Sequence, residues 1–188
     1  MWIAGAALIA SYGAVRAYAD VQRQEGIAAF RQARLPDQSA WSEGRIRAYA
    51  PDLASHPERL PEAVLRIPGV KLTVPVYSDT SARSLNRGAG LIAGTARPEA
   101  AGNIGIAAHR DGFFRVLKDV VVGDRLEIEG LSGTRVYRVD ALSVVRPEDM
   151  RPLRQTSRSV VTLVTCYPFY YVGNAPRRYI VRAVAVDP

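Results

Sequence analysis

The sequence predicts an all-β domain, either a barrel or a sandwich, that follows a helical N-terminal region. Short runs rich in Val, Ile and Leu recur from residue 63 onward, and Gly, Pro and Asp bound them. Few helical segments separate these runs, whereas regular alternation of strands and helices would indicate a parallel sheet. The chain of 188 residues is long enough to bury one substantial hydrophobic core.

The first element is an apolar segment over residues 1–19. No charged side chain precedes Arg16, and residues 17–19 extend the apolar run. We expect a signal-anchor helix that crosses the membrane once, although the run is shorter than the roughly 20 residues usual for such a helix. A cleaved signal peptide is one alternative, because Ala17-Tyr18-Ala19 has the small-x-small form of a cleavage site. A buried helix of the globular domain is the other.

A polar region over residues 20–62 comes next. Residues 20–34 are compatible with a helix, and residues 35–62 contain four prolines among Ser, Asp and Glu. This region is expected to be a juxtamembrane helix and a spacer. The remaining residues, 63–188, are expected to form the functional domain.

Eight strands are expected in that domain, each an apolar or β-branched run that ends at turn residues. They cover residues 63–67, 71–77, 90–94, 103–109, 125–129, 135–145, 160–165 and 179–186. Short helices are expected at residues 81–87 and 112–117. No internal repeat is visible.

Charge and composition narrow the function. Lys and Arg number 25 against 18 acidic residues, and this excess suits nucleic acid, an anionic membrane or wall polymer, or simple solubility. The arginines are scattered and no nucleic-acid-binding motif accompanies them, so we expect no nucleic-acid partner. A single cysteine excludes an internal disulfide, and neither histidine has metal-ligand spacing. We therefore expect no metal and no cofactor.

Three side chains at expected strand ends suit covalent catalysis. Cys166 follows the run 160–165, and His109 follows the run 103–108. A thiol and an imidazole that meet across a sheet supply a nucleophile and a proton-transfer group. Arg178 or Arg182 in the last strand would stabilise an oxyanion, and strand alternation does not choose between them. The plainer interpretations are a packed cysteine, a hydrogen-bonded surface histidine and a solvated arginine.

These residues lie in three ordered motifs that resemble those of the sortase family. Thr162-Leu163-Val164-Thr165-Cys166 fits the T-L-x-T-C signature, residues 105–114 resemble the histidine segment, and residues 175–183 resemble the arginine segment and favour Arg178. The resemblance spans about residues 64–186, and residues 166–173 look most like class D. Ala108 departs from the pattern, because a glycine is expected there.

The resemblance implies a closed eight-stranded β-barrel and a cysteine transpeptidase. It also implies a catalytic domain outside the cytoplasm on a membrane anchor, against the cytoplasmic orientation that the positive-inside rule gives for arginines after residue 15. Cys166 would form a thioacyl intermediate with an LPxTG-like sorting signal of a secreted protein. His109 would transfer protons, Arg178 would hold the oxyanion, and the acceptor would be an amine of a peptidoglycan precursor or a pilin lysine.

Four residues are expected to bind the substrate: Leu153, Val164, Thr165 and Tyr167. Leu153 lies in residues 146–159, which resemble the loop that recognises the sorting signal. For Tyr167 and the aromatic residues after it, packing at the barrel end is an open alternative.

Two further residues, Asn103 and Asp111, are expected to support His109. Turn formation is the alternative role for both.

Two other functions compete with the transpeptidase. One is a Cys-His endopeptidase that passes the acyl group to water, although papain-like enzymes place the cysteine before the histidine. The other is a non-catalytic envelope barrel whose basic surface binds anionic polymers. Only the second would be indifferent to Cys166→Ala.

Overall fold

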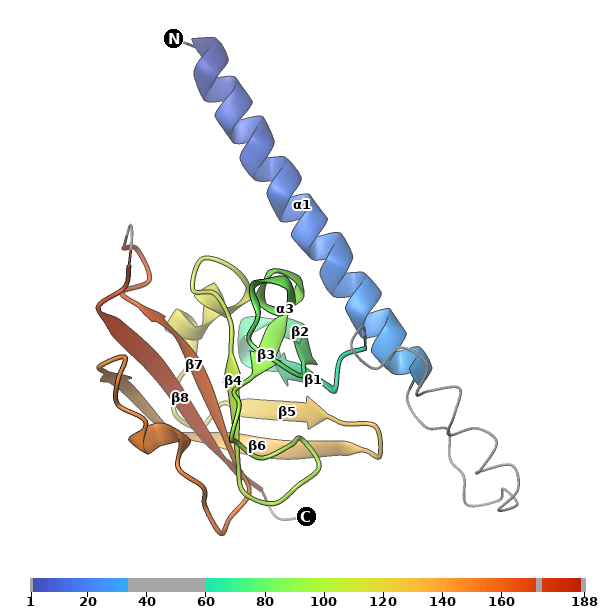
Figure 1. Cartoon of the computed structure of the whole chain (residues 1–188), viewed down its shortest axis with the longest axis vertical. Helices are drawn as coiled ribbons and strands as arrows, with labels where there is room; N and C mark the ends of the chain where they lie inside the picture. The colour runs from blue at the N-terminus through green and yellow to red at the C-terminus, as the bar shows by residue number, and fades with distance from the viewer. Residues whose placement is uncertain (1, 34–59, 172–173, 187–188) are drawn as a thin grey trace.

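The computed structural model describes residues 2–33, 60–171 and 174–186, and it consists of a long helix beside a β-barrel (Figure 1). Most of the expected spacer, residues 34–59, lies outside the described residues. The first strand begins at Ala63, where the apolar runs of the sequence begin.

The strands close into a barrel in the order β1-β2-β3-β4-β7-β8-β6-β5. The pairs β2–β3 and β4–β7 are parallel, and the other neighbours are antiparallel. The all-β prediction is confirmed, and closure decides for the barrel over the sandwich. The strands are β1 (Ala63–Ile67), β2 (Leu72–Tyr77), β3 (Ala89–Leu91), β4 (Asn103–Ala107), β5 (Arg125–Glu129), β6 (Thr134–Val145), β7 (Val160–Tyr167) and β8 (Arg177–Ala185).

The helices between strands are short, as expected. They are α3 (Ala82–Arg87) and the 3-10 turns η2 (Pro68–Val70), η3 (Phe113–Asp119) and η4 (Arg151–Leu153). Several expected strand bounds differ from the structure by one to three residues, and β3 stops at Leu91 instead of residue 94. β4 stops at Ala107, which leaves His109 in the following loop, and β7 runs on through Cys166 to Tyr167.

Helix α1 (Trp2–Ala33) is a single element of 32 residues that combines the two parts expected over residues 1–34. Among the described residues, no helix joins the length and the apolar character that crossing a membrane requires. The membrane helix expected over residues 1–19 is therefore not found there.

The C-terminal third of α1 packs against the barrel. Ile27 and Phe30 are buried together with Val64 of β1. Gly26 permits the close approach to β2, because a Cβ atom there would lie 2.6 Å from the Tyr77 hydroxyl and 3.1 Å from Pro75. Figure 1 shows the N-terminal part of α1 projecting away from the barrel.

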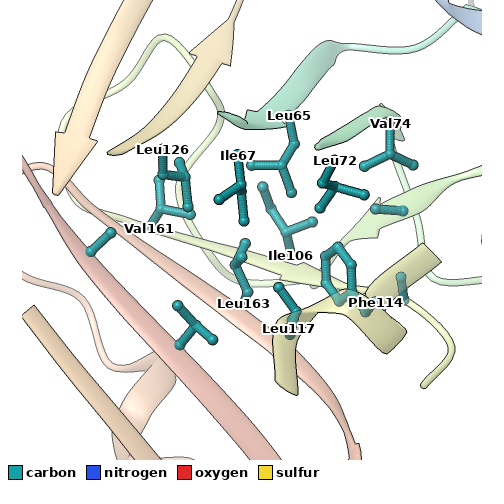
Figure 2. Packing of buried hydrophobic residues seen from close by; sticks show 14 of the residues in the cluster. Leu65, Ile67, Leu72, Val74, Ile106, Phe114, Leu117, Leu126, Val161 and Leu163 are labelled. Atoms are coloured by element: carbon teal, nitrogen blue, oxygen red, sulfur yellow. The ribbon is translucent and has the colours of Figure 1, made fainter. Parts of the chain in front are cut away.

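The hydrophobic core fills the barrel (Figure 2). Alternation along β4 and β7 turns Ile106, Val161 and Leu163 inward, where η3 adds Phe114. Each fully buried side chain of this size stabilises the fold by about 1.5 to 3 kcal/mol relative to exposure. Because side chains alternate along a strand, the residues between these in β4 and β7 point to the opposite face of the sheet.

Candidate active site

The parallel pairing of β4 with β7 places the ends of both strands at the same edge of the barrel. Ala107 is the partner of Val164, so His109 and Cys166 each lie two residues farther along neighbouring chain segments. The loop after β4 stays attached to β7, because the Ala108 amide donates to the Val164 carbonyl at 3.3 Å. His109 is exposed and Cys166 is half-buried. A soluble reactant can therefore reach both.

Arg178 lies directly opposite Cys166 in the antiparallel β7–β8 ladder. Directly opposite residues have Cβ atoms about 4.5 to 5.5 Å apart and share a face. The Arg178 guanidinium donates to the carbonyls of Ala175 and Arg177, at 3.4 and 3.1 Å, which holds it at the beginning of β8.

Arg182, the other arginine that alternation permits, occupies a different position. It lies opposite Thr162, four residues from Cys166, and forms an ion pair with Asp140 of β6. Register thus supplies the choice of Arg178 that strand periodicity alone leaves open.

The face that carries Cys166 continues along both strands as Val164, Thr162 and Ala107. Turn η4 covers this face. A Cβ atom on Gly105 would lie 2.9 Å from the Leu153 Cδ2 atom, so Leu153 packs directly on the backbone of β4. Leu153 and Val164 therefore lie on the Cys166 face of the sheet.

Thr165 is on the other face. Its side chain is 2% exposed, and its hydroxyl donates to the Ala108 carbonyl at 2.8 Å. Alternation turns the Thr165 side chain toward the interior, away from the face on which substrate binding is expected. It instead joins the loop that carries His109 to the strand that carries Cys166.

Asn103 is also placed differently from the prediction. Its amide donates to the carbonyls of Pro152 and Arg154, at 2.8 and 3.0 Å, and its side-chain oxygen accepts from the Thr162 hydroxyl at 2.8 Å. Asn103 lies at the first position of β4, whereas His109 lies two residues beyond the last position of that strand. Asn103 therefore holds the loop that contains η4 and does not support the histidine.

Asp149 forms further hydrogen bonds within the loop that contains η4. Its carboxylate accepts from the backbone amide of Arg151 at 3.1 Å and from the Arg151 guanidinium at 2.8 and 2.6 Å. The hydrogen bonds from Arg151 lower the pKa of Asp149 to about 2. The carboxylate therefore stays charged, and the bonds remain in place, throughout the neutral range.

Tyr167 belongs to an aromatic cluster at the barrel end. Its ring centroid lies 5.9 Å from Phe169 and 6.0 Å from Tyr179, and Phe169 is buried. Burial raises the pKa of Tyr179, which keeps its hydroxyl neutral. For Tyr167 the structure supports the packing interpretation over substrate binding.

Two arginines that the sequence analysis did not single out connect the histidine loop to the segment after Cys166. Arg110 donates to the carbonyls of Pro168 and Tyr171, at 3.2 and 2.6 Å. The Arg115 guanidinium lies 4.8 Å from the ring centroid of Tyr170. Arg110 adjoins His109 in sequence, but nothing local reveals these distant partners.

A cavity of about 760 Å³ opens beside His109. Its walls come from residues 12–23 of α1, the beginning of β2, the end of α3 and η3. Asp111 is exposed and lines this cavity together with His109.

The strand register thus brings a cysteine, a histidine and an arginine to neighbouring chain segments at one edge of the closed β-barrel. This arrangement is that of a barrel with a cysteine-based active site. The sortase domain family matches residues 65–186, about two thirds of the sequence. The chain belongs to the sortase family.

Individual relatives agree with this assignment. The chain is 34% identical to sortase D of Bacillus subtilis (strain 168) over 119 residues, 63% of this chain and 60% of that protein. Sortase C1 of GBS Pilus Island 1 is similar in structure, with a TM-score of 0.72 at 25% identity over 88% of this chain and 93% of that one. Clostridium perfringens sortase C, solved with the C-terminal cell wall sorting motif, has a TM-score of 0.62 at 27% identity over 73% and 77%.

Proposed function

We propose that this chain is a cysteine transpeptidase that cleaves an LPxTG-like sorting signal and joins the released protein to an amine. The observation that carries the proposal is the register of three strands, in which Arg178 lies opposite Cys166 and the neighbouring strand β4 ends two residues before His109. Membership of the sortase family supports it, as does the sorting motif in the structure of the clostridial relative.

Acylation is the first step. The Cys166 thiolate attacks the carbonyl carbon of the threonine in the signal, and Arg178 stabilises the oxyanion that forms. Collapse of this intermediate breaks the C–N bond, and His109 gives its proton to the departing amine. Nearby cations favour the thiolate, which is the attacking form of a cysteine side chain.

Transfer is the second step. The acceptor amine attacks the thioester carbonyl carbon, its proton passes to His109, and the sulfur of Cys166 leaves with the bonding electrons. One amide bond replaces another, so the reaction consumes no water and no redox partner. The site is returned to its starting state.

The sorting signal would bind on the face that carries Cys166. Val164 and Leu153 give this face apolar side chains, and the loop held by Asn103 covers it. An extended peptide with a leucine and a proline before the threonine suits such a surface.

We place the enzyme at the outer face of the cell membrane as part of the same proposal. Secreted proteins and cell-envelope amines, the two reactants, are found together there. Protease digestion of intact cells that express the chain tests this location, because a domain outside the cytoplasm is degraded while cytoplasmic markers survive.

The test of the reaction uses the full chain with a quenched LPxTG-type peptide library and triglycine, and mass spectrometry identifies the products. We expect an amine-ligated product that disappears in Cys166→Ala and His109→Ala. Products of hydrolysis alone would replace the proposal with the endopeptidase. A complete lack of Cys166-dependent product would leave the non-catalytic envelope barrel.

A further inference from the structure

The cavity beside His109 has a different lining from the face that carries Cys166. His109 contributes to it, together with Lys71 of the chain before β2 and Arg16 of α1. Cys166, Val164 and Leu153 are not among its lining residues. A molecule in this cavity and a peptide on the Cys166 face therefore approach His109 from two different sides.

We propose that this cavity binds the acceptor amine and selects amines that also carry a negatively charged group. The inference rests on the proposed transpeptidase function. His109 is the group that serves both half-reactions, and the reactant that gives it a proton must lie against it while the acyl group occupies Cys166. The cavity is the space beside His109 that the bound sorting signal leaves open.

The lining of the cavity is strongly basic. Its charged side chains, besides His109, carry an excess of three positive charges, from Arg16, Arg23, Lys71, Arg87 and Arg115 against Asp20 and Asp111. Part of this charge is already engaged. Arg23 lies 3.2 Å from the Asp20 carboxylate and donates to the Thr73 carbonyl at 3.2 Å.

The other cations of the lining differ in how accessible they are. Lys71 and Arg16 are exposed, and the Arg16 Nε atom donates to the Tyr12 hydroxyl at 3.0 Å. The Nε atom of Arg87 is buried and has no hydrogen-bond partner among the described residues, while its guanidinium lies 4.9 Å from the Tyr77 ring centroid. These groups suit a carboxylate or a phosphate, because charge-assisted hydrogen bonds from guanidinium and ammonium groups bind such anions best.

The same charge acts on the amine itself. A positive surround disfavours the ammonium form, so it raises the fraction of free amine, which is the nucleophile. A plain alkylamine would be weakly held, whereas an amine with an anionic group would be both bound and deprotonated. The volume lies within the range of about 300 to 1,000 Å³ that small-molecule sites occupy, so the fitting acceptor is a small molecule or a short peptide.

In the step that results, the amine nitrogen bonds to the thioester carbonyl carbon and the C–S bond breaks. The sulfur keeps the electron pair, and the proton from nitrogen moves to His109. The anionic group of the acceptor stays on the basic wall and takes no part in bond making.

Two matched pairs of acceptors test the inference with the full-length enzyme. Triglycine and triglycinamide have the same amine and differ in the free carboxylate, and O-phosphoethanolamine and ethanolamine differ in the phosphate. Transfer is measured as kcat/KM for the acceptor, relative to thioacyl formation in the same variant. We expect the anionic member of at least one pair to be preferred about tenfold, because only that member gains a charge-assisted hydrogen bond from the basic lining.

Arg16→Gln and Lys71→Gln should reduce that preference to nearly one. Arg125→Gln, a control on β5 outside the cavity, should keep the wild-type ratio. Equal use of both members of each pair, or a preference that survives Arg16→Gln and Lys71→Gln, would overturn the inference. Intact-mass detection of the acyl group on Cys166 separates the two proposals, because its absence defeats the transpeptidase itself.

Discussion

Cys166 and Arg178 lie opposite each other in the strand register, whereas Arg182 lies opposite Thr162. Variants of the two arginines can therefore be compared directly. Arg178→Gln removes the guanidinium of the residue opposite Cys166, whereas Arg182→Gln removes one that is bound to Asp140. We expect thioacyl formation to slow about 100-fold in the first variant, the cost of losing one oxyanion donor. The second should stay within a few-fold of wild type in stopped-flow acylation. Equal losses in both variants would contradict the assignment.

Asn103 offers a second test at the residue scale. Asn103→Ala leaves two carbonyls and the Thr162 hydroxyl without this partner and should cost about 1 to 3 kcal/mol of unfolding free energy. Because the loop over the Cys166 face loosens, KM for the sorting peptide should rise several-fold while kcat changes little.

Thr156→Val is the control for Asn103→Ala, since Thr156 lies in the same loop and, within the described part of the chain, its hydroxyl bonds only to the Arg158 carbonyl of that loop. Steady-state kinetics on both variants decide the matter. A fall in kcat with an unchanged KM would return Asn103 to the support of His109.

The segment after β7 is hydrogen-bonded to the loop after β4, which carries His109 and Arg110. Arg110→Gln removes the hydrogen bonds to the Pro168 and Tyr171 carbonyls. We expect faster amide hydrogen exchange over residues 168–171 and a lower kcat, because Cys166 and His109 are no longer joined through their loops. Arg115→Gln, which removes a ring contact with Tyr170, should have the smaller effect. Unchanged exchange in Arg110→Gln would refute the coupling.

The packing of α1 on β2 can be tested through Gly26 and Tyr77. Gly26→Ala introduces a Cβ atom 2.6 Å from the Tyr77 hydroxyl, and overpacking of this kind costs about 1 to 3 kcal/mol. Tyr77→Phe removes that hydroxyl, which is buried without a hydrogen-bond partner among the described residues, and should not destabilise.

In the double variant the substitution at Gly26 should cost much less, because the closest contact is gone. Urea unfolding of the two single variants and the double variant measures this coupling. Additive free energies would show that α1 does not approach β2 in this way.

The response to pH is a property of the whole molecule. Burial raises the pKa of Tyr77 and of Tyr137, in each case against a lowering effect of a nearby arginine. The folded state therefore holds these phenol protons more tightly than the unfolded state does. Their contribution to stability is fully present below about pH 10 and is lost as the pH rises through the higher folded values.

Urea midpoints measured from neutral to strongly alkaline pH should fall above that point, together with the rise of phenolate absorbance. Tyr137→Phe should flatten the decline, because it removes the fully buried phenol. A steep decline that Tyr137→Phe leaves unchanged would assign the alkaline transition to other groups.

Some features of the fold and the site can be predicted from the sequence and others cannot, and the reason is physical. Local alternation and turn residues predict the strands, and the three motifs predict Cys166, His109 and Arg178. What the side chains of Thr165, Asn103 and Arg110 bind depends on partners about 50 to 60 residues away. Such distant pairing has no local signal, so these residues became interpretable only in the folded barrel.

The parallel β4–β7 pair has a consequence for the newly made chain. His109 and Cys166 are 57 residues apart in the sequence, and Arg178 follows on the last strand. A chain that has been synthesised only through Cys166 already contains His109 but lacks Arg178, so the three meet only after the final strand is in place. The Cys166 thiol therefore gains its full set of catalytic partners only when folding is complete.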